Sequence, residues 1–203
     1  MTMANKVTIL RILLIPFFVV EMVYYVRTGD ERFRLAGLLS FALASILDGV
    51  DGYIARHYNQ WSELGTILDP LADKLLLVSA IALLSFDHSP QLGQLPLWLT
   101  GIIIGRDLLL AIGAVVVRLV VGNITVRPRL TGKIATVLQM AVVIWLLLEW
   151  DKALGAAWLP MLELGAGLFT AASGLLYVFD GAKQLSTHPA SLPGKPEAAG
   201  RHR

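Results

Sequence analysis

The chain has 203 residues, of which 56% are hydrophobic and 16% are charged, and it contains no Cys. About a quarter of the residues of a typical soluble domain are charged, so this composition indicates a protein that resides in lipid. It excludes a disordered chain and a disulfide-stabilised secreted scaffold. The net charge of +2 gives no support for nucleic-acid binding. The positions of the few charged residues are therefore the most informative feature.

Six stretches of the chain are long and apolar enough to cross a bilayer, which takes about 20 residues of helix. In chain order they are Val7–Val26, Leu35–Ile54, Thr66–Phe86, Leu95–Val121, Ile134–Leu148 and Leu159–Phe179. Polar or turn-forming segments separate them. The sequence therefore predicts an all-α fold with six transmembrane helices. We expect one transmembrane domain over residues 1–182 and a disordered cytoplasmic tail over residues 183–203.

The distribution of Lys and Arg predicts how the chain is oriented in the membrane. With the N-terminus inside, the segments on the cytoplasmic side carry more Lys and Arg than the loops on the opposite side. Cytoplasmic segments of membrane proteins are enriched in these residues. Both termini are therefore expected in the cytoplasm.

Acidic residues gather at the ends of the second and third stretches, which a short polar turn joins. These residues are Asp48, Asp51, Asp69 and Asp73. An ionised Asp inside a membrane costs a few kcal/mol, so four in one hairpin require compensation. Helical spacing puts two groups of residues on two faces: Asp48, Asp51, Gly52 and Ala55 on the first, and Gly65, Asp69 and Asp73 on the second. If the two helices are antiparallel neighbours, the carboxylates face one another near the cytoplasmic side.

Carboxylates in this arrangement are typical ligands of hard divalent cations such as Mg²⁺ or Mn²⁺, and substrate phosphate oxygens would complete the coordination. Gly52, Ala55 and Gly65 leave bare backbone against which a phosphate-bearing ligand could lie, and Arg56 is placed to pair with a phosphate. Hydrated interfacial acids and a tight helix crossing through the glycines are simpler explanations. A divalent-cation transporter would also use the acids, but it has no use for Ala55 and Arg56 at this spacing.

The segment from Asp48 to Asp73 fits the pattern D-x2-D-G-x2-A-R-x8-G-x3-D-x3-D at all eight fixed positions. This pattern resembles the signature of the CDP-alcohol phosphatidyltransferases. The resemblance implies an integral membrane enzyme, usually a homodimer, that moves a phosphatidyl group from CDP-diacylglycerol to an alcohol acceptor and releases CMP. It implies a place in the bacterial cytoplasmic membrane, with the active site on the cytoplasmic side.

The resemblance also implies roles for individual residues. It assigns the metal to Asp48, Asp51, Asp69 and Asp73. It assigns the CDP moiety to Asp51, Gly52, Ala55, Arg56 and Gly65. Asp73 would also be the general base that takes the proton from the attacking hydroxyl. Asn5, Thr8 and Arg11 could line the nucleotide site from the first stretch, although helix capping explains them equally well.

Cationic residues in and after the fourth stretch bear on the identity of the acceptor. Arg106 lies beside Asp107 inside an apolar run, and Arg118 and Lys133 follow. An intramembrane cation indicates a functional site with an anionic partner, here Asp107, one of the four acids or an acceptor phosphate. The orientation rule is the alternative explanation, but it explains Arg106 poorly. These cations therefore predict a site for a phosphorylated acceptor such as glycerol 3-phosphate.

Resemblances within the family differ on the acceptor. The segments NKVTILRILLIPFF, DPLADKL and TGKIATVLQM resemble phosphatidylglycerophosphate synthases. The segment GRDLLL departs from the GRE-type segment common in those enzymes, and it is more similar to cardiolipin synthases, which use phosphatidylglycerol. Glycerol 3-phosphate is the favoured acceptor, with phosphatidylglycerol as the alternative.

Overall fold

The computed structural model describes residues 3–57, 63–88, 91–121, 130–150, 155 and 157–187. Within these ranges, the side chains of residues 3–6, 49–57, 63–70, 73, 117, 118, 120, 121 and 184–187 are not described. The described residues form six α-helices: α1 (Met3–Thr28), α2 (Glu31–His57), α3 (Glu63–Ser85), α4 (Leu97–Val121), α5 (Leu130–Leu148) and α7 (Trp158–Thr187). The predicted all-α fold class is confirmed.

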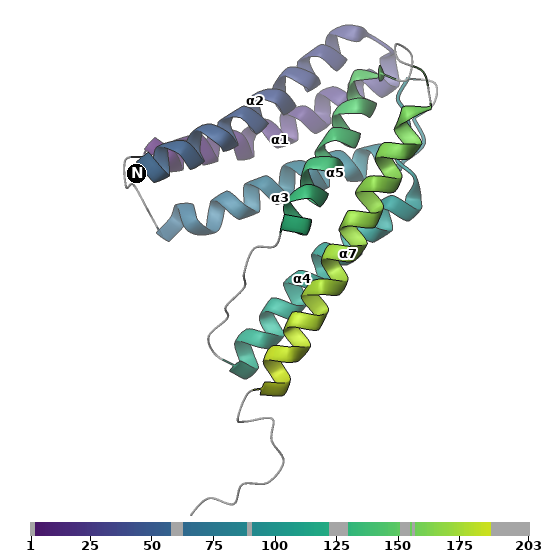
Figure 1. Ribbon diagram of the computed structural model, residues 1–203. Helices are drawn as coiled ribbons and strands as arrows, with labels where there is room; N and C mark the ends of the chain where they lie inside the picture. Colours follow the sequence, from purple (N-terminus) through teal and green to yellow (C-terminus); the bar gives the residue numbers. More distant parts are fainter. Residues whose placement is uncertain are drawn as a thin grey trace, which may run out of the picture.

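The helices pack as two groups that share one core (Figure 1). Helices α1 and α2 lie side by side, with α3 along α1, and α7 packs against both α4 and α5. The core contains fully buried side chains from both groups, among them Phe18, Met22, Leu84, Leu99 and Leu147. Because the core draws on helices from both halves of the chain, the positions of the two groups depend on each other.

The connection between α1 and α2 shows how local sequence ends one helix and starts the next. Gly29 has a φ of 69° and its N–H donates to the Tyr25 carbonyl at 2.8 Å, which closes the C-terminus of α1. Asp30 then accepts a hydrogen bond from the Arg32 backbone N–H at 3.0 Å and caps the N-terminus of α2. The turn is therefore much shorter than the polar segment between the predicted spans.

Within the described residues, four segments are long and apolar enough to cross a membrane: Val7–Thr28, Leu97–Val116, Leu130–Leu148 and Trp158–Lys183. Helices α2 and α3 do not qualify. The uncharged part of α2 runs only from Leu35 to Leu47, between Arg34 and Asp48, and the apolar part of α3 is Lys74–Ser85. The predicted count of six spans is thus not confirmed, although each of the six predicted segments corresponds to one α-helix.

Apolar side chains face outward from the helices. Leu13, Leu39, Leu119, Leu168 and Phe179 are each more than 60% exposed. A soluble domain rarely exposes so many large apolar side chains, whereas lipid solvates them at no cost. The chain is therefore an integral membrane protein.

Helix α7 continues to Thr187, past the boundary predicted at residue 182. The remainder of the predicted tail, residues 188–203, lies outside the described residues.

Candidate active site

Asp48 is the member of the acidic motif whose side chain the structure describes. It lies in the C-terminal half of α2, its side chain is 45% exposed, and its carboxylate forms an ion pair with the Arg11 guanidinium of α1. Arg11 and its neighbour Thr8 are both completely buried. The Arg11–Asp48 ion pair is consistent with the expectation that Arg11 lines the site from α1, because the Arg11 guanidinium binds the first acid of the motif.

The other residues of the motif are placed by their helices. Helix α2 carries Asp51, Gly52, Ala55 and Arg56, and helix α3 carries Gly65, Asp69 and Asp73. Their side chains lie outside the described residues, so the convergence of the four acids stays a prediction. Among the described side chains, no group of three or more potential metal ligands occurs. The helical backbones of α2 and α3 are compatible with the prediction that the motif residues of each helix share one face, since residues three or four apart lie on the same side of a helix.

A chain of polar contacts begins one residue after the motif. Lys74 of α3 donates from Nζ to Asp107 Oδ2 of α4 at 2.6 Å. The other oxygen, Oδ1, accepts a hydrogen bond from Arg106 Nη1 at 2.8 Å. The partner of Arg106, which the sequence left open between three candidates, therefore includes Asp107. Lys74 was not predicted as a site residue, although its place directly after Asp73 in an apolar helix was a signal.

Arg106 is held in a slot between α5 and α7. Its side chain is 9% exposed, and Nη2 donates to the Oγ of Ser173, a fully buried residue of α7, at 3.2 Å. The slot depends on two glycines. A Cβ at Gly132 would lie 3.1 Å from Arg106 Nη2, and one at Gly174 would lie 3.4 Å from Arg106 Cγ. Arg106 Nε is buried and has no hydrogen-bond partner among the described residues.

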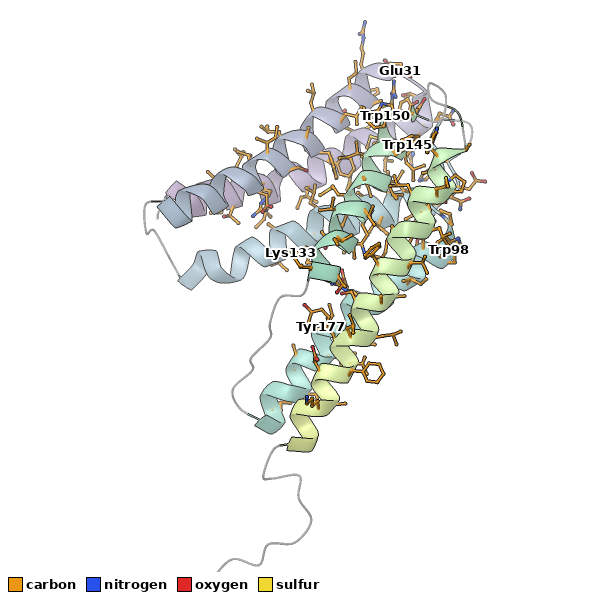
Figure 2. All side chains as sticks on the ribbon, in the orientation of Figure 1. Glu31, Trp98, Lys133, Trp145, Trp150 and Tyr177 are labelled. Carbon is orange, nitrogen blue, oxygen red and sulfur yellow. The ribbon has the colours of Figure 1, made fainter. Side chains whose placement is uncertain are left out.

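The two other predicted acceptor-site cations differ in their relation to Arg106. Lys133 is exposed and directly follows Gly132, so its backbone lies beside the slot at the start of α5 (Figure 2). Arg118 lies on the same helix as Arg106, twelve residues further on, which corresponds to about 18 Å along an α-helix. The described structure thus brings Arg106 close to Lys133 but not to Arg118, whose side chain is not described.

A second buried polar cluster, which the sequence did not predict, lies at the opposite end of α1. Tyr25 donates its hydroxyl proton to Glu149 Oε1 at 2.6 Å, and Arg34 Nη1 lies 3.8 Å from the same oxygen. Glu149 is 8% exposed and has a φ of 53°, which a residue other than glycine adopts only at some cost. Figure 2 shows Trp145 and Trp150, which lie four residues before and one residue after Glu149 in the sequence, at this end of the molecule near Glu31.

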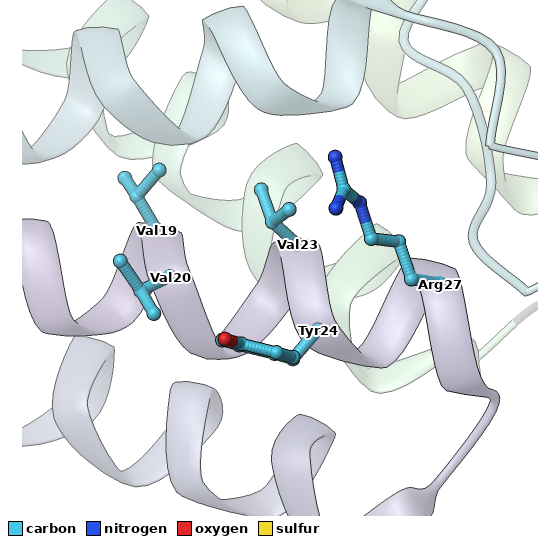
Figure 3. A pocket seen from close by; sticks show the side chains of 5 residues that line it. All are labelled: Val19, Val20, Val23, Tyr24 and Arg27. Atoms are coloured by element: carbon cyan, nitrogen blue, oxygen red, sulfur yellow. The ribbon is translucent and has the colours of Figure 1, made fainter.

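A shallow hollow of about 310 Å³ lies on α1, away from the acidic motif (Figure 3). Its lining consists of Val19, Val20, Val23, Tyr24 and Arg27, all from that one helix. The lining is mainly apolar, as on a membrane helix that acyl chains cover, and it contains none of the predicted site residues.

The family model described as CDP-alcohol phosphatidyltransferase matches residues 1–176 of the chain. The CDP-diacylglycerol–glycerol-3-phosphate 3-phosphatidyltransferase of Bacillus subtilis is 36% identical over 195 residues, covering 90% of this chain and 96% of that protein. A probable phosphatidylglycerophosphate synthase of Mycobacterium tuberculosis is 34% identical, covering 87% of this chain and 79% of that protein.

A relative named for a different activity is also similar to this chain. The probable CMP-forming cardiolipin synthase of Drosophila melanogaster is 34% identical, with 89% of this chain and 58% of that protein covered. The known proteins similar to this chain therefore include both a probable phosphatidylglycerophosphate synthase and a probable cardiolipin synthase, the two groups that its sequence segments resemble. The match of the family model over most of the chain, including the whole acidic motif, leads to one conclusion. The chain belongs to the CDP-alcohol phosphatidyltransferase family.

Proposed function

We propose that the chain transfers the phosphatidyl group of CDP-diacylglycerol to glycerol 3-phosphate and releases CMP. The observation that carries the choice of acceptor is the charge balance around Arg106. Among the described residues, the cations of Lys74 and Arg106 share the carboxylate of Asp107, and the exposed Lys133 directly follows Gly132, which borders the Arg106 guanidinium. An excess of positive charge among these described side chains favours an anionic ligand, and a phosphomonoester supplies the negative charge.

The donor end of the site is assigned to the acidic motif. Asp48, Asp51, Asp69 and Asp73 would hold Mg²⁺ or Mn²⁺, because all four offer the hard oxygen ligands that these ions prefer. When bound, the ion neutralises the charge of the diphosphate and orients it for displacement. The CDP moiety would lie against Asp51, Gly52, Ala55, Arg56 and Gly65. Arg11 holds Asp48 from α1 and so fixes the orientation of one acid of the set.

Asp73 is proposed as the general base. The acceptor hydroxyl oxygen attacks the phosphorus that bears the diacylglycerol, a new P–O bond forms, and the P–O bond to CMP breaks. The hydroxyl proton passes to the Asp73 carboxylate, and CMP leaves as the anion. Such transfers depend mainly on positioning and on neutralisation of charge, which suits a site built from carboxylates and cations.

The arrangement in the membrane is proposed as follows. All six helices cross or enter the bilayer of a bacterial inner membrane. Two copies of the chain form a homodimer. Both termini and the site lie on the cytoplasmic face. Residues 1–182 form the transferase domain, and residues 183–203 carry the end of α7 followed by the cytoplasmic tail. The divalent-cation transporter is not proposed, because the family match concerns transferases.

Cardiolipin synthesis is the second candidate. The similarity to the Drosophila relative and the GRD segment at Arg106 favour it. Phosphatidylglycerol is itself an anionic lipid with a free hydroxyl, so the same cations could bind its phosphodiester. In that case Arg118, which lies on α4 at a distance from Arg106, could bind a second part of this larger acceptor.

The test offers both acceptors in parallel to the purified protein in detergent, with CDP-diacylglycerol and Mg²⁺ or Mn²⁺, and measures CMP release. We expect release with glycerol 3-phosphate and formation of phosphatidylglycerophosphate. Release with phosphatidylglycerol alone would establish the second candidate, and no release with either acceptor would contradict the transferase proposal. Asp73→Asn is expected to abolish turnover while nucleotide binding stays measurable. Undiminished turnover in that variant would refute its role as base.

A further inference from the structure

Asp107 is the point at which the two ends of the proposed site are connected. Its two oxygens bind two different cations on two different helices, Lys74 Nζ at 2.6 Å and Arg106 Nη1 at 2.8 Å. Lys74 directly follows the proposed base Asp73, and Arg106 is the proposed ligand of the acceptor phosphate. We propose that Asp107 is a positioning residue that fixes the acceptor cation relative to the base. This inference rests on the proposed function.

The surroundings of Asp107 allow little freedom. Its side chain is 17% exposed and that of Arg106 is 9% exposed. Ser173 and the glycines at positions 132 and 174 hold the guanidinium from the far side, so Arg106 cannot turn freely toward water. The short Asp107 side chain therefore holds the guanidinium firmly on one side and, on the other, connects it to α3 through Lys74, whose side chain is 46% exposed.

The cations of Lys74 and Arg106 predict that removal of the Asp107 carboxylate affects kcat and the KM for the acceptor differently. In Asp107→Asn the two cations remain, and the local positive charge increases by one. An anionic acceptor is therefore expected to bind at least as well as in the wild-type protein. The bound phosphate is no longer held at a fixed distance from the base, and misplacement of about 1 Å can lower a rate about a hundredfold.

The expected result is a split between kcat and KM. For Asp107→Asn we expect kcat to fall about tenfold or more, while the apparent KM for glycerol 3-phosphate does not rise. The KM for CDP-diacylglycerol should stay within about twofold of wild type, because that substrate binds the acidic motif. Asp107→Glu keeps the charge and both oxygens, and its kcat is expected to lie closer to the wild-type value than that of Asp107→Asn.

A merely structural ion pair would behave differently. Its loss would lower kcat only in proportion to the fraction of protein that still binds nucleotide, which titration with CDP measures independently. Glu31→Gln is the matched control, since Glu31 accepts a hydrogen bond from Arg34 at 2.6 Å at the other end of the molecule. This control is expected to leave kcat and both KM values unchanged.

Combining variants tests whether Lys74 acts through Asp107. Lys74→Met and Asp107→Asn should cost less together than the sum of their separate effects on kcat, because each breaks the same contact. An unchanged kcat in Asp107→Asn, a loss of kcat matched by a loss of CDP-binding protein, or a strongly raised KM for the acceptor would each overturn the inference. If the wild-type protein is inactive with glycerol 3-phosphate, the proposed function fails instead. The same comparison with phosphatidylglycerol, also anionic, then tests Asp107.

Discussion

Replacing Tyr25 with Phe is expected to destabilise the protein without altering the transferase site. The substitution keeps the buried ring and removes only the hydroxyl that donates to Glu149 Oε1 at 2.6 Å. The same hydroxyl lies 3.1 Å from the Gln91 carbonyl oxygen, but it has one proton, and the shorter contact assigns that proton to Glu149. The substitution therefore deprives a buried carboxylate of a hydrogen-bond donor.

The size of the effect follows from what remains around Glu149. Hydrogen bonds to charged groups contribute about 1.5–3 kcal/mol, and the acceptor here is 8% exposed, which makes replacement by water difficult. Arg34 stays within 3.8 Å and compensates part of the loss. We therefore expect the free energy of unfolding to fall by about 2 kcal/mol, which corresponds to about 4–8 °C in apparent Tm for a chain of this size.

Tryptophan fluorescence during heating in detergent measures this effect directly. The rings of Trp145 and Trp150 form a T-shaped pair with centroids 5.4 Å apart, and both residues lie next to Glu149 in the chain or within a few positions of it. Tyr24→Phe is the control, because Tyr24 is 51% exposed and its ring stacks on Phe33 with or without the hydroxyl. Equal Tm values for the two variants would refute the reasoning. So would a loss of kcat in Tyr25→Phe at low temperature.

Two further substitutions test the packing of α7. Gly167→Ala places a Cβ 2.5 Å from Trp98 Cζ3, so we expect a loss of about 1–3 kcal/mol in the free energy of unfolding. Gly165→Ala meets nothing closer than 3.9 Å, so we expect no loss and a gain of up to about 1 kcal/mol from the higher helix propensity of Ala. Apparent Tm in detergent distinguishes the two variants. Thr170→Val leaves the buried Gln139 amide without its acceptor at 2.8 Å and should cost about 1–3 kcal/mol, which adding Gln139→Leu should largely restore. A double variant no more stable than Thr170→Val would contradict that account.

The sequence was sufficient to locate the helices, because long apolar runs interrupted by polar turns have few other structures available in lipid. It was less informative about their ends. The polar residues around Gly29 and Asp30 suggested a long connection, yet two residues make the turn and the flanking charged residues are helical. Capping by Asp30 and a positive φ at Gly29 allow both helices to continue to the turn.

The polar contacts of the site, and those of the second cluster at Glu149, depend on pairings that sequence spacing does not encode. Lys74 and Asp107 are 33 residues apart, and Tyr25 and Glu149 are 124 apart. A helical period places residues on one face of one helix, but it does not state which helix lies opposite. The acidic motif could be recognised because its spacing is local. The role of Lys74 could not, because it depends on how α3 packs near α4.

The short uncharged part of α2 has a consequence for the depth of the site. From Leu35 to Leu47 the helix rises about 20 Å, which is about 10 Å less than the hydrocarbon thickness of a bilayer. If the end at Arg34 stays at one surface, this hydrophobic mismatch requires either a locally thinned membrane or an Asp48 carboxylate below the level of the surrounding headgroups. In both cases a lipid substrate can bring its diphosphate to Asp48 by lateral diffusion, without withdrawing its acyl chains from the bilayer.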